Sequence, residues 1–152
     1  MCIRDSCWEG EPPPGQEAEI IEIGVCVLDV LTGERLARES ILVRPERSQV
    51  SAFCTQLTTL TPERVARGVT FERACRILRR KYGAGDRAWA SYGDEDRRLF
   101  EKQCAARGAP YPFGPTHLNA VSYTHLRAHE TVLDTVCRLL LEKQNQYIDL
   151  PY

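Results

Sequence analysis

The residues best placed to do chemistry are two aspartates, Asp94 and Asp96, at a point where a strand runs directly into a helix. Residues 88–92 have the composition of a short strand that breaks at Gly93, and a helix is expected to follow at once. In α/β folds, the carboxyl ends of strands are where catalytic and binding sites are commonly found. A structural alternative is also open, because both aspartates suit the first turn of a helix and its dipole.

The helix that begins here places Asp96 at the edge of an apolar face. Residues three and four positions apart share one face of a helix, so Asp96 lies on the same face as Leu99, Phe100 and Cys104, which we expect to be core. Asp94 precedes the first turn and is a good side-chain N-cap. The local sequence alone does not decide between chemistry and capping.

The elements around this unit have an α/β order. In chain order they are strands 19–30 and 35–44 with a turn at Thr32–Gly33, helices from Thr61 to Gly68 and from Thr70 to Gly83, strand 88–92, the helix up to Gly108, and strand 116–121. Strand 19–30 is apolar on both faces, as a central strand is. The segment 51–58 is too short and mixed to assign by periodicity. The order predicts a mixed sheet flanked by helices.

Composition excludes several classes of protein. Lysine and arginine number 20 against 21 acidic residues, so the net charge of −1 gives no basic excess and no expectation of a basic stripe for nucleic acid. Seven cysteines without a Cys-x-x-Cys pair argue against a disulfide framework and a zinc ribbon. Several of them occupy apolar positions, which predicts reduced thiols in a cytoplasmic protein. No apolar run is long enough to span a membrane.

From Cys7 to Asn119 the chain resembles the DEDDh 3′–5′ exonucleases, and within them the exoribonuclease branch of the histone-mRNA exonucleases and the bacterial KapD-like proteins. Three matching stretches carry this resemblance: Glu-Ile-Ile-Glu-Ile-Gly at 19–24, Ser-x-Phe-Cys-x-x-Leu-Thr at 51–58, and Ser-Tyr-Gly-Asp-Glu-Asp at 91–96 with His-Leu-Asn at 117–119. The second stretch is the most specific of the three. Thr59 stands where this branch usually has glycine.

The resemblance implies a ribonuclease-H-like α/β fold and hydrolysis of single-stranded nucleic acid from its 3′ end, RNA more than DNA. In that family four carboxylates hold two Mg²⁺ or Mn²⁺ ions and a histidine acts as general base. Asp96 matches the catalytic, metal-binding acid of the second motif, and Asp94 is the less favoured candidate. The resemblance also places four residues beside the terminal nucleotide: Phe53, Cys54, Leu57 and Thr58. For Phe53 and Leu57, packing in the core is an equally open alternative.

The departures from the family pattern predict loss of hydrolysis. Its first motif, Asp-x-Glu, falls on Cys2 and Arg4, which cannot bind Mg²⁺ as carboxylates do. Asp5 is one position away and would point to the opposite face of its strand. His129 and Asp134 have the His-x-x-x-x-Asp spacing of the third motif. They follow the last strand too closely, so we interpret that spacing as coincidence.

Both ends of the chain resemble translated sequencing-adapter read-through. We therefore expect a non-native leader at 1–6, a partial exonuclease domain at 7–120 that is truncated at both ends, and a non-native tail at 121–152 that is helical over 128–143. Two other functions stay open. The first is a non-catalytic module on a degenerate exonuclease fold that binds nucleic acid or protein. The second is an interaction protein that uses the amphipathic face of residues 132–141.

Overall fold

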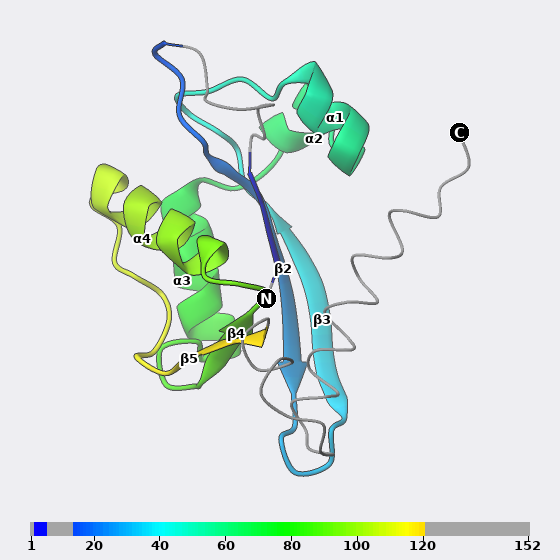
Figure 1. The fold of residues 1–152 in the computed structure, drawn as a ribbon, viewed down its shortest axis with the longest axis vertical. Coiled ribbons are helices and arrows are strands. Elements are labelled where there is room, and N and C mark those ends of the chain that lie inside the picture. Colours follow the sequence, from blue (N-terminus) through cyan, green and yellow to red (C-terminus); the bar gives the residue numbers. More distant parts are fainter. Residues whose placement is uncertain (1, 6–13, 121–152) are drawn as a thin grey trace.

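The computed structural model describes residues 2–5 and 14–120 (Figure 1). Its elements are, in chain order, β1 Cys2–Asp5, β2 Ile20–Leu28, β3 Arg35–Leu42, α1 Ala52–Thr58, α2 Pro62–Ala66, α3 Phe71–Tyr82, β4 Trp89–Ser91, α4 Glu95–Arg107 and β5 His117–Asn119. The expected order is confirmed, with two additions. Residues 2–5, which carry no sequence pattern, form β1, and the unassigned segment forms α1.

Three strands form an antiparallel sheet in the order β1-β2-β3. Glu22 of β2 lies opposite Arg4 on one side and Leu42 on the other, which confirms that β2 is central. The hairpin between β2 and β3 is longer than the expected two-residue turn. Its first residue, Asp29, explains this, because its Oδ1 accepts from the amides of Leu31 and Thr32 at 2.8 and 3.0 Å and stabilises a wider loop.

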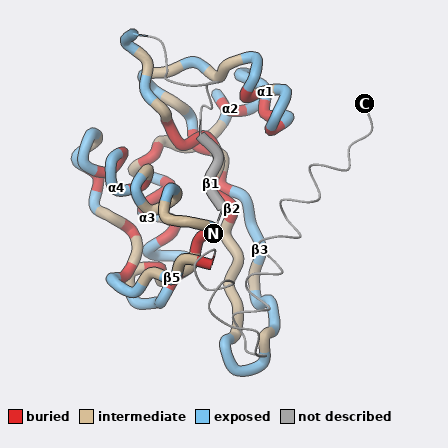
Figure 2. The backbone as a smooth tube through the Cα atoms, viewed as in Figure 1, coloured by how far each residue is buried: buried red, intermediate tan, exposed pale blue. Residues whose placement is uncertain are grey.

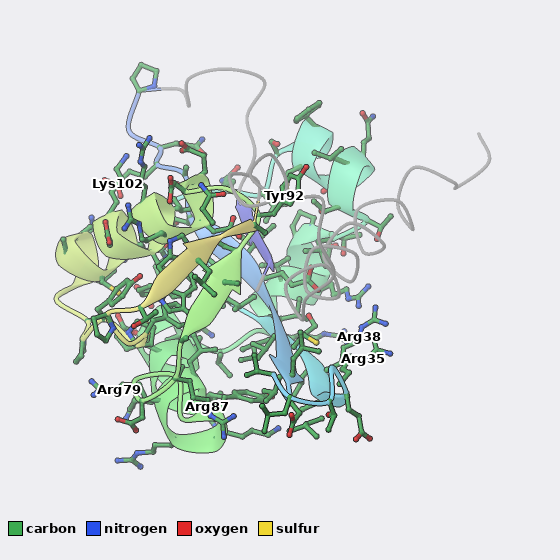
Figure 3. The ribbon with its side chains drawn as sticks, turned by 60° about the horizontal axis from the view of Figure 1, so that its bottom comes forward. Arg35, Arg38, Arg79, Arg87, Tyr92 and Lys102 are labelled. Atoms are coloured by element: carbon green, nitrogen blue, oxygen red, sulfur yellow. The ribbon has the colours of Figure 1, made fainter. Side chains whose placement is uncertain are left out.

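The strands β4 and β5 form a parallel pair, which makes the architecture mixed. Trp89 lies opposite His117 and Ser91 opposite Asn119. Because the two strands run the same way, their carboxyl ends meet at one edge. Figures 1 and 3 both show β1 next to that edge.

Helices cover both faces of the antiparallel sheet. Adjacent residues of β2 point to opposite faces. Ile20 belongs to the larger core with α3, α4 and their buried residues, among them Phe71, Leu78 and Phe100. Ile21 belongs to a smaller core with α1 and α2: Cys54, Leu60 and Val65. Figure 2 shows the buried residues where these helices meet the sheet.

Hydroxyl side chains begin the first three helices. Ser51, Thr61 and Thr70 each accept a hydrogen bond from the amide three residues on, and the two threonines stand where the sequence predicts these helices to begin. The helix α1 ends at Thr59, whose φ of 61° is in the left-handed region. That conformation costs least for glycine, the residue that the resemblance leads us to expect at this position. No helix in the described part of the chain is long and apolar enough to cross a membrane.

Candidate functional site

The carboxyl ends of β4 and β5 and the start of α4 bring polar residues to one edge of the fold. β4 stops at Ser91, and the chain turns through Gly93, whose φ is 91°, into the first turn of α4. Three neighbours of that turn are Asp94, His117 and Asn119, joined by the contacts described below. The expected strand–glycine–helix unit is therefore confirmed.

Asp94 does not cap α4 with its side chain, so that prediction was wrong. It occupies the N-cap position, but its backbone is in the right-handed helical region (φ −93°, ψ −11°) instead of the extended region that capping needs. Its carboxylate bonds to β5 instead. Asp94 Oδ2 accepts from Asn119 Nδ2 at 3.0 Å, and Oδ1 lies 3.9 Å from the Arg97 guanidinium. The side chain thus joins the start of α4 to the end of β5.

Asp96 is half-buried in the first turn of α4. It lies at the edge of a face whose next members are Phe100, which is fully buried, and Cys104, which is nearly so. The predicted apolar face is confirmed for these two residues, and Leu99 is partly buried against the same core. The role of Asp96 as a metal ligand stays a prediction.

His117 links Ser91 to Asp94. Its Nε2 lies 2.7 Å from Ser91 Oγ, and its Nδ1 lies 3.6 Å from Asp94 Oδ1. Ser91 Oγ is also 2.7 Å from the carbonyl oxygen of Gly93, to which it donates its one proton. Nε2 of His117 must therefore donate to Ser91. The imidazole packs against the Trp89 ring with centroids 4.2 Å apart.

The contacts of Ser91, His117 and Asp94 have the connectivity of a serine-hydrolase triad, but they cannot work as one. The nucleophile of such a triad must reach a substrate and pass its proton to the histidine. Ser91 is 0% exposed, and its proton is held by Gly93. The three residues are therefore a bridge between β4, β5 and α4 that is buried at Ser91 and partly exposed at Asp94.

The helix α1 divides the four residues proposed beside a nucleotide into two pairs. Cys54 and Thr58 are buried, and Thr58 Oγ1 donates to the Cys54 carbonyl at 2.7 Å. Phe53 is 39% exposed and Leu57 58% exposed. The alternative that Phe53 and Leu57 pack in the core is therefore wrong. They form an apolar pair one helical turn apart on the surface.

The fold has close counterparts among solved structures. The nuclease domain of 3′hExo, a DEDDh family member bound to rAMP, has a TM-score of 0.73 at 23% identity, covering 98% of this chain and 92% of that chain. A full-length 3′-exonuclease has a TM-score of 0.71 at 25% identity, covering 95% and 80%. A structure on 3′-end-specific recognition of the histone mRNA stem-loop by 3′-exonuclease has a TM-score of 0.65 at 22% identity, again covering 95% and 80%. The resemblance to the DEDDh 3′-exonucleases is confirmed.

Sequence comparison supports the same likeness over a shorter stretch. The 3′–5′ exonuclease Snipper of Drosophila melanogaster is 35% identical over 71 residues, which cover 45% of this chain. The chain spans about a quarter of the length of that curated relative, 25% of it being matched. No family model matches the chain. The ribonuclease-H-like α/β fold is therefore shared with the DEDDh enzymes, and activity on a given substrate is a separate question.

The residues of the described part do not fit the metal centre that the DEDDh fold implies. Within residues 2–5 and 14–120 no group of three or more His, Cys, Asp or Glu side chains could hold an ion. The strand β1, next to the carboxyl ends of β4 and β5 (Figures 1 and 3), carries Cys2 and Arg4, the residues onto which the resemblance places the two acids of the first motif. His129 and Asp134 lie outside the described residues.

Sequence reasoning missed the organising role of His117. A single histidine in a short strand gives no signal of its own, because its partners Ser91 and Asp94 are more than twenty positions away. The register of the sheet supplies the missing information. The parallel pairing of β4 with β5 places His117 opposite Trp89, and Trp89 lies on the same face of β4 as Ser91. Only the fold could reveal this.

The bridge predicts a pH dependence of stability. Burial, followed by the nearby Arg97 charge, lowers the pKa of His117 below 6.5, and Asp94 opposes this only in part. The unfolded chain then binds the proton first, so the stability from neutral His117 is present above pH 6.5 and is lost as pH falls towards the folded-state pKa. We expect the difference in unfolding free energy between the native chain and His117→Gln to shrink from about pH 7.5 to about pH 5. Urea titrations followed by circular dichroism measure it, and a constant difference would contradict the assignment.

Proposed function

We propose that this chain is the core of a 3′–5′ exonuclease domain that binds the 3′ end of single-stranded nucleic acid, RNA in preference to DNA, without hydrolysing it. One observation carries the proposal: the turn from β4 through Gly93 into α4 presents half-buried Asp96 at the carboxyl ends of a parallel pair, on a DEDDh-type fold. The preference for RNA is supported by the structural neighbours, one bound to rAMP and one engaging a histone mRNA stem-loop.

In an intact relative, two Mg²⁺ or Mn²⁺ ions would clamp the attacking and leaving oxygens of the phosphodiester. Asp96 is the residue we assign to that role by ancestry. The positions on β1 that should supply two more carboxylates hold a thiol and a guanidinium, Cys2 and Arg4. A cation at Arg4 would repel a divalent ion where a carboxylate would attract it. We therefore propose that this polypeptide binds nucleic acid but does not hydrolyse it.

The exposed pair on α1 supports the binding part of the proposal. Phe53 and Leu57 keep a large fraction of their surface in water although they belong to the most specific motif of the chain. An exposed aromatic ring is a surface on which the last base of a strand can stack, and such stacking does not need a metal ion. Cys54 and Thr58 would act indirectly, by fixing the inner face of α1.

The experiment compares two double variants, each of which replaces a pair of exposed apolar side chains by serine. Phe53→Ser with Leu57→Ser is expected to weaken binding of a linear RNA with a free 3′ hydroxyl by about 10-fold or more, given roughly 1–3 kcal/mol per stacked base. The control is Val30→Ser with Leu31→Ser, an apolar pair at the hairpin tip that is 68% and 95% exposed. Fluorescence anisotropy in EDTA gives both affinities.

Equal losses in the two double variants would show that only surface hydrophobicity was removed, and would overturn the assignment of α1. Loss of all binding in EDTA would contradict metal-independent binding. We also propose a cytoplasmic setting, since none of the described cysteines, Cys26, Cys54, Cys75 and Cys104, forms a disulfide and three of them are buried. The alternative that uses residues 132–141 lies outside the described residues.

A further inference from the structure

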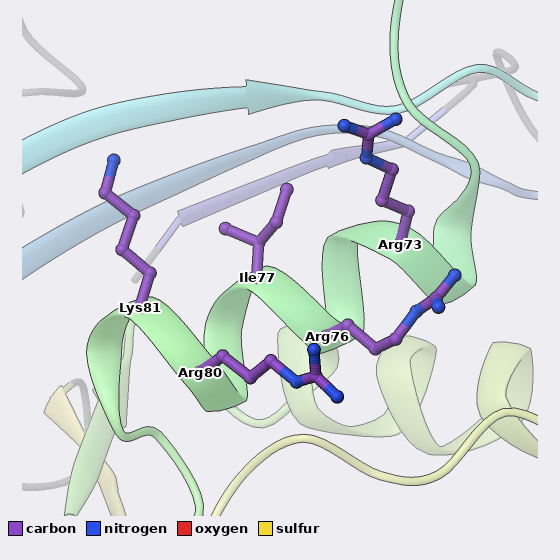
Figure 4. A pocket seen from close by; sticks show the side chains of 5 residues that line it. All are labelled: Arg73, Arg76, Ile77, Arg80 and Lys81. Carbon is purple, nitrogen blue, oxygen red and sulfur yellow. The ribbon is translucent and has the colours of Figure 1, made fainter.

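The outer face of α3 carries a row of cations. Arg73, Arg76, Ile77, Arg80 and Lys81 follow the three- and four-residue spacing of one helical face and line a shallow hollow of about 450 Å³ (Figure 4). The opposite face of α3 is buried in the larger core. The expectation of no basic stripe was therefore wrong. The net charge of −1 is a sum over the whole chain and does not show that cations gather on one face of this helix.

Three of these cations have no counterion in the described part of the chain. Lys81 Nζ lies 2.5 Å from Glu39 Oε2, and this contact lowers the pKa of Glu39. No ion pair involves Arg73, Arg76 or Arg80 among residues 2–5 and 14–120, and all three are exposed. In Figure 4 Arg73 and Lys81 point towards the β-strands, whereas Arg76 and Arg80 point away from them along the helix.

Helix stability does not explain this arrangement. Like charges three and four residues apart destabilise a helix by a few tenths of a kcal/mol per pair. The helix α3 already has an N-cap at Thr70, a left-handed C-cap at Gly83 and a buried apolar face. Only Arg80 and its neighbours in the last turn gain from the helix dipole. Arg73 and Arg76 gain nothing from it, which points to an external anion.

We propose that Arg73, Arg76 and Arg80 bind the phosphate backbone of nucleic acid, at a surface separate from the 3′-end site. From residue 73 to residue 80 the helix rises by about 10 Å. Successive phosphates on one strand of a duplex rise by about 3.4 Å along the helix axis, and they lie farther apart in an extended single strand, so a row of this length spans more than one phosphate. Guanidinium groups bind phosphate oxygens in bidentate fashion, and Ile77 offers an apolar floor between them for a sugar or base.

The surface shares no residue with the turn at Gly93 or with the pair Phe53 and Leu57. This surface therefore binds the backbone of a strand and needs no free 3′ end. The inference goes beyond the proposed function and does not depend on it. A circular single strand, which has no 3′ end, separates the two surfaces cleanly.

The test measures anisotropy of a labelled circular oligonucleotide of about 30 nucleotides over a range of salt. The triple variant Arg73→Ala, Arg76→Ala, Arg80→Ala is expected to lose at least about 10-fold in affinity at about 0.1 M salt, and its slope of log K against log salt should fall by about 2. The control triple variant, equal in charge change, is Arg38→Ala, Arg64→Ala, Lys102→Ala; all three of its residues are exposed.

Equal losses in both triple variants, an unchanged salt slope, or no binding of the circle by the native chain would overturn the proposal. So would stronger arginine-dependent binding to vesicles of anionic phospholipid than to the circle, which would assign the surface to a membrane. If the triple variant melts at a lower temperature, Arg76→Glu alone gives the same readout against Lys102→Glu. Phe53→Ser with Leu57→Ser should leave the circle bound, so failure of one site does not imply failure of the other.

Discussion

Arg107→Ala is expected to lower the free energy of unfolding by about 3–5 kcal/mol, because it leaves a buried carboxylate without its cation. The Arg107 guanidinium pairs with Glu19 in a contact where the side chains are 9% and 3% exposed. It also lies 2.8 Å from Glu46 Oε2. The pair joins the end of α4 to the residue just before β2. Loss of Arg107 therefore affects the larger core directly.

Glu19 has further partners that make its charge necessary. Its carboxylate accepts from the backbone amides of Glu46, Arg47 and Ser48 at 3.3, 2.9 and 2.7 Å. It thus organises the loop that follows β3 as well as the end of α4. When the cation is removed, the carboxylate stays buried, and its amide partners do not supply a full compensating charge.

Urea denaturation followed by circular dichroism measures this effect. The matched control is Arg98→Ala, which removes an ion pair with Glu95 on the same helix whose side chains are 67% and 86% exposed. We expect less than about 1 kcal/mol for the control, as is usual at the surface. A loss for Arg107→Ala no larger than that for Arg98→Ala would contradict the account of the buried pair.

The second prediction with a large effect is that the chain does not hydrolyse nucleic acid. With Mg²⁺ or Mn²⁺ present, we expect the chain to release no nucleotides from a 3′-labelled RNA oligonucleotide, while it retains anisotropy-detected binding to the same strand. The physical reason is that no group of three or more His, Cys, Asp or Glu side chains in the described part of the chain could hold an ion, whereas each divalent ion binds through several oxygen ligands. Denaturing electrophoresis over a time course measures release.

Metal-dependent trimming that Asp96→Ala abolishes would contradict this prediction. It would also make His129 and Asp134 serious candidates for the general base and the last acid. Trimming that survives Asp96→Ala would point to a contaminating nuclease, and a repurified Asp96→Ala preparation is the control for that case.

Much of the fold could be predicted because local signals agreed. Thr61 with Pro62, and Thr70 with Gly83, mark helix ends by chemistry that acts within one turn. The central position of β2 was predictable from apolar residues on both faces. The helix α1 was missed, because a helix of seven residues has too few turns to show a period.

The site was less predictable, since its contacts span distant segments. The local sequence predicted that Asp94 caps α4 with its side chain. Its backbone is helical instead of extended, and its carboxylate accepts a hydrogen bond from the side-chain amide of Asn119 in β5. The outer face of α3 was missed for a different reason. Whole-chain charge averages over all faces, whereas a ligand meets one face at a time.

Mn²⁺ binding by the double variant Cys2→Asp, Arg4→Glu is the measurement that tests the central claim most directly. That claim is that Asp96 is a metal ligand whose partners on β1 have been replaced. The variant is expected to bind Mn²⁺, followed by electron paramagnetic resonance, at least about 10-fold more tightly than the native chain, since added carboxylates supply the missing charge and oxygen ligands. Asp96→Asn in that background should remove the gain, and Asp94→Asn should leave most of it. No gain, or a gain that survives Asp96→Asn, would contradict the account.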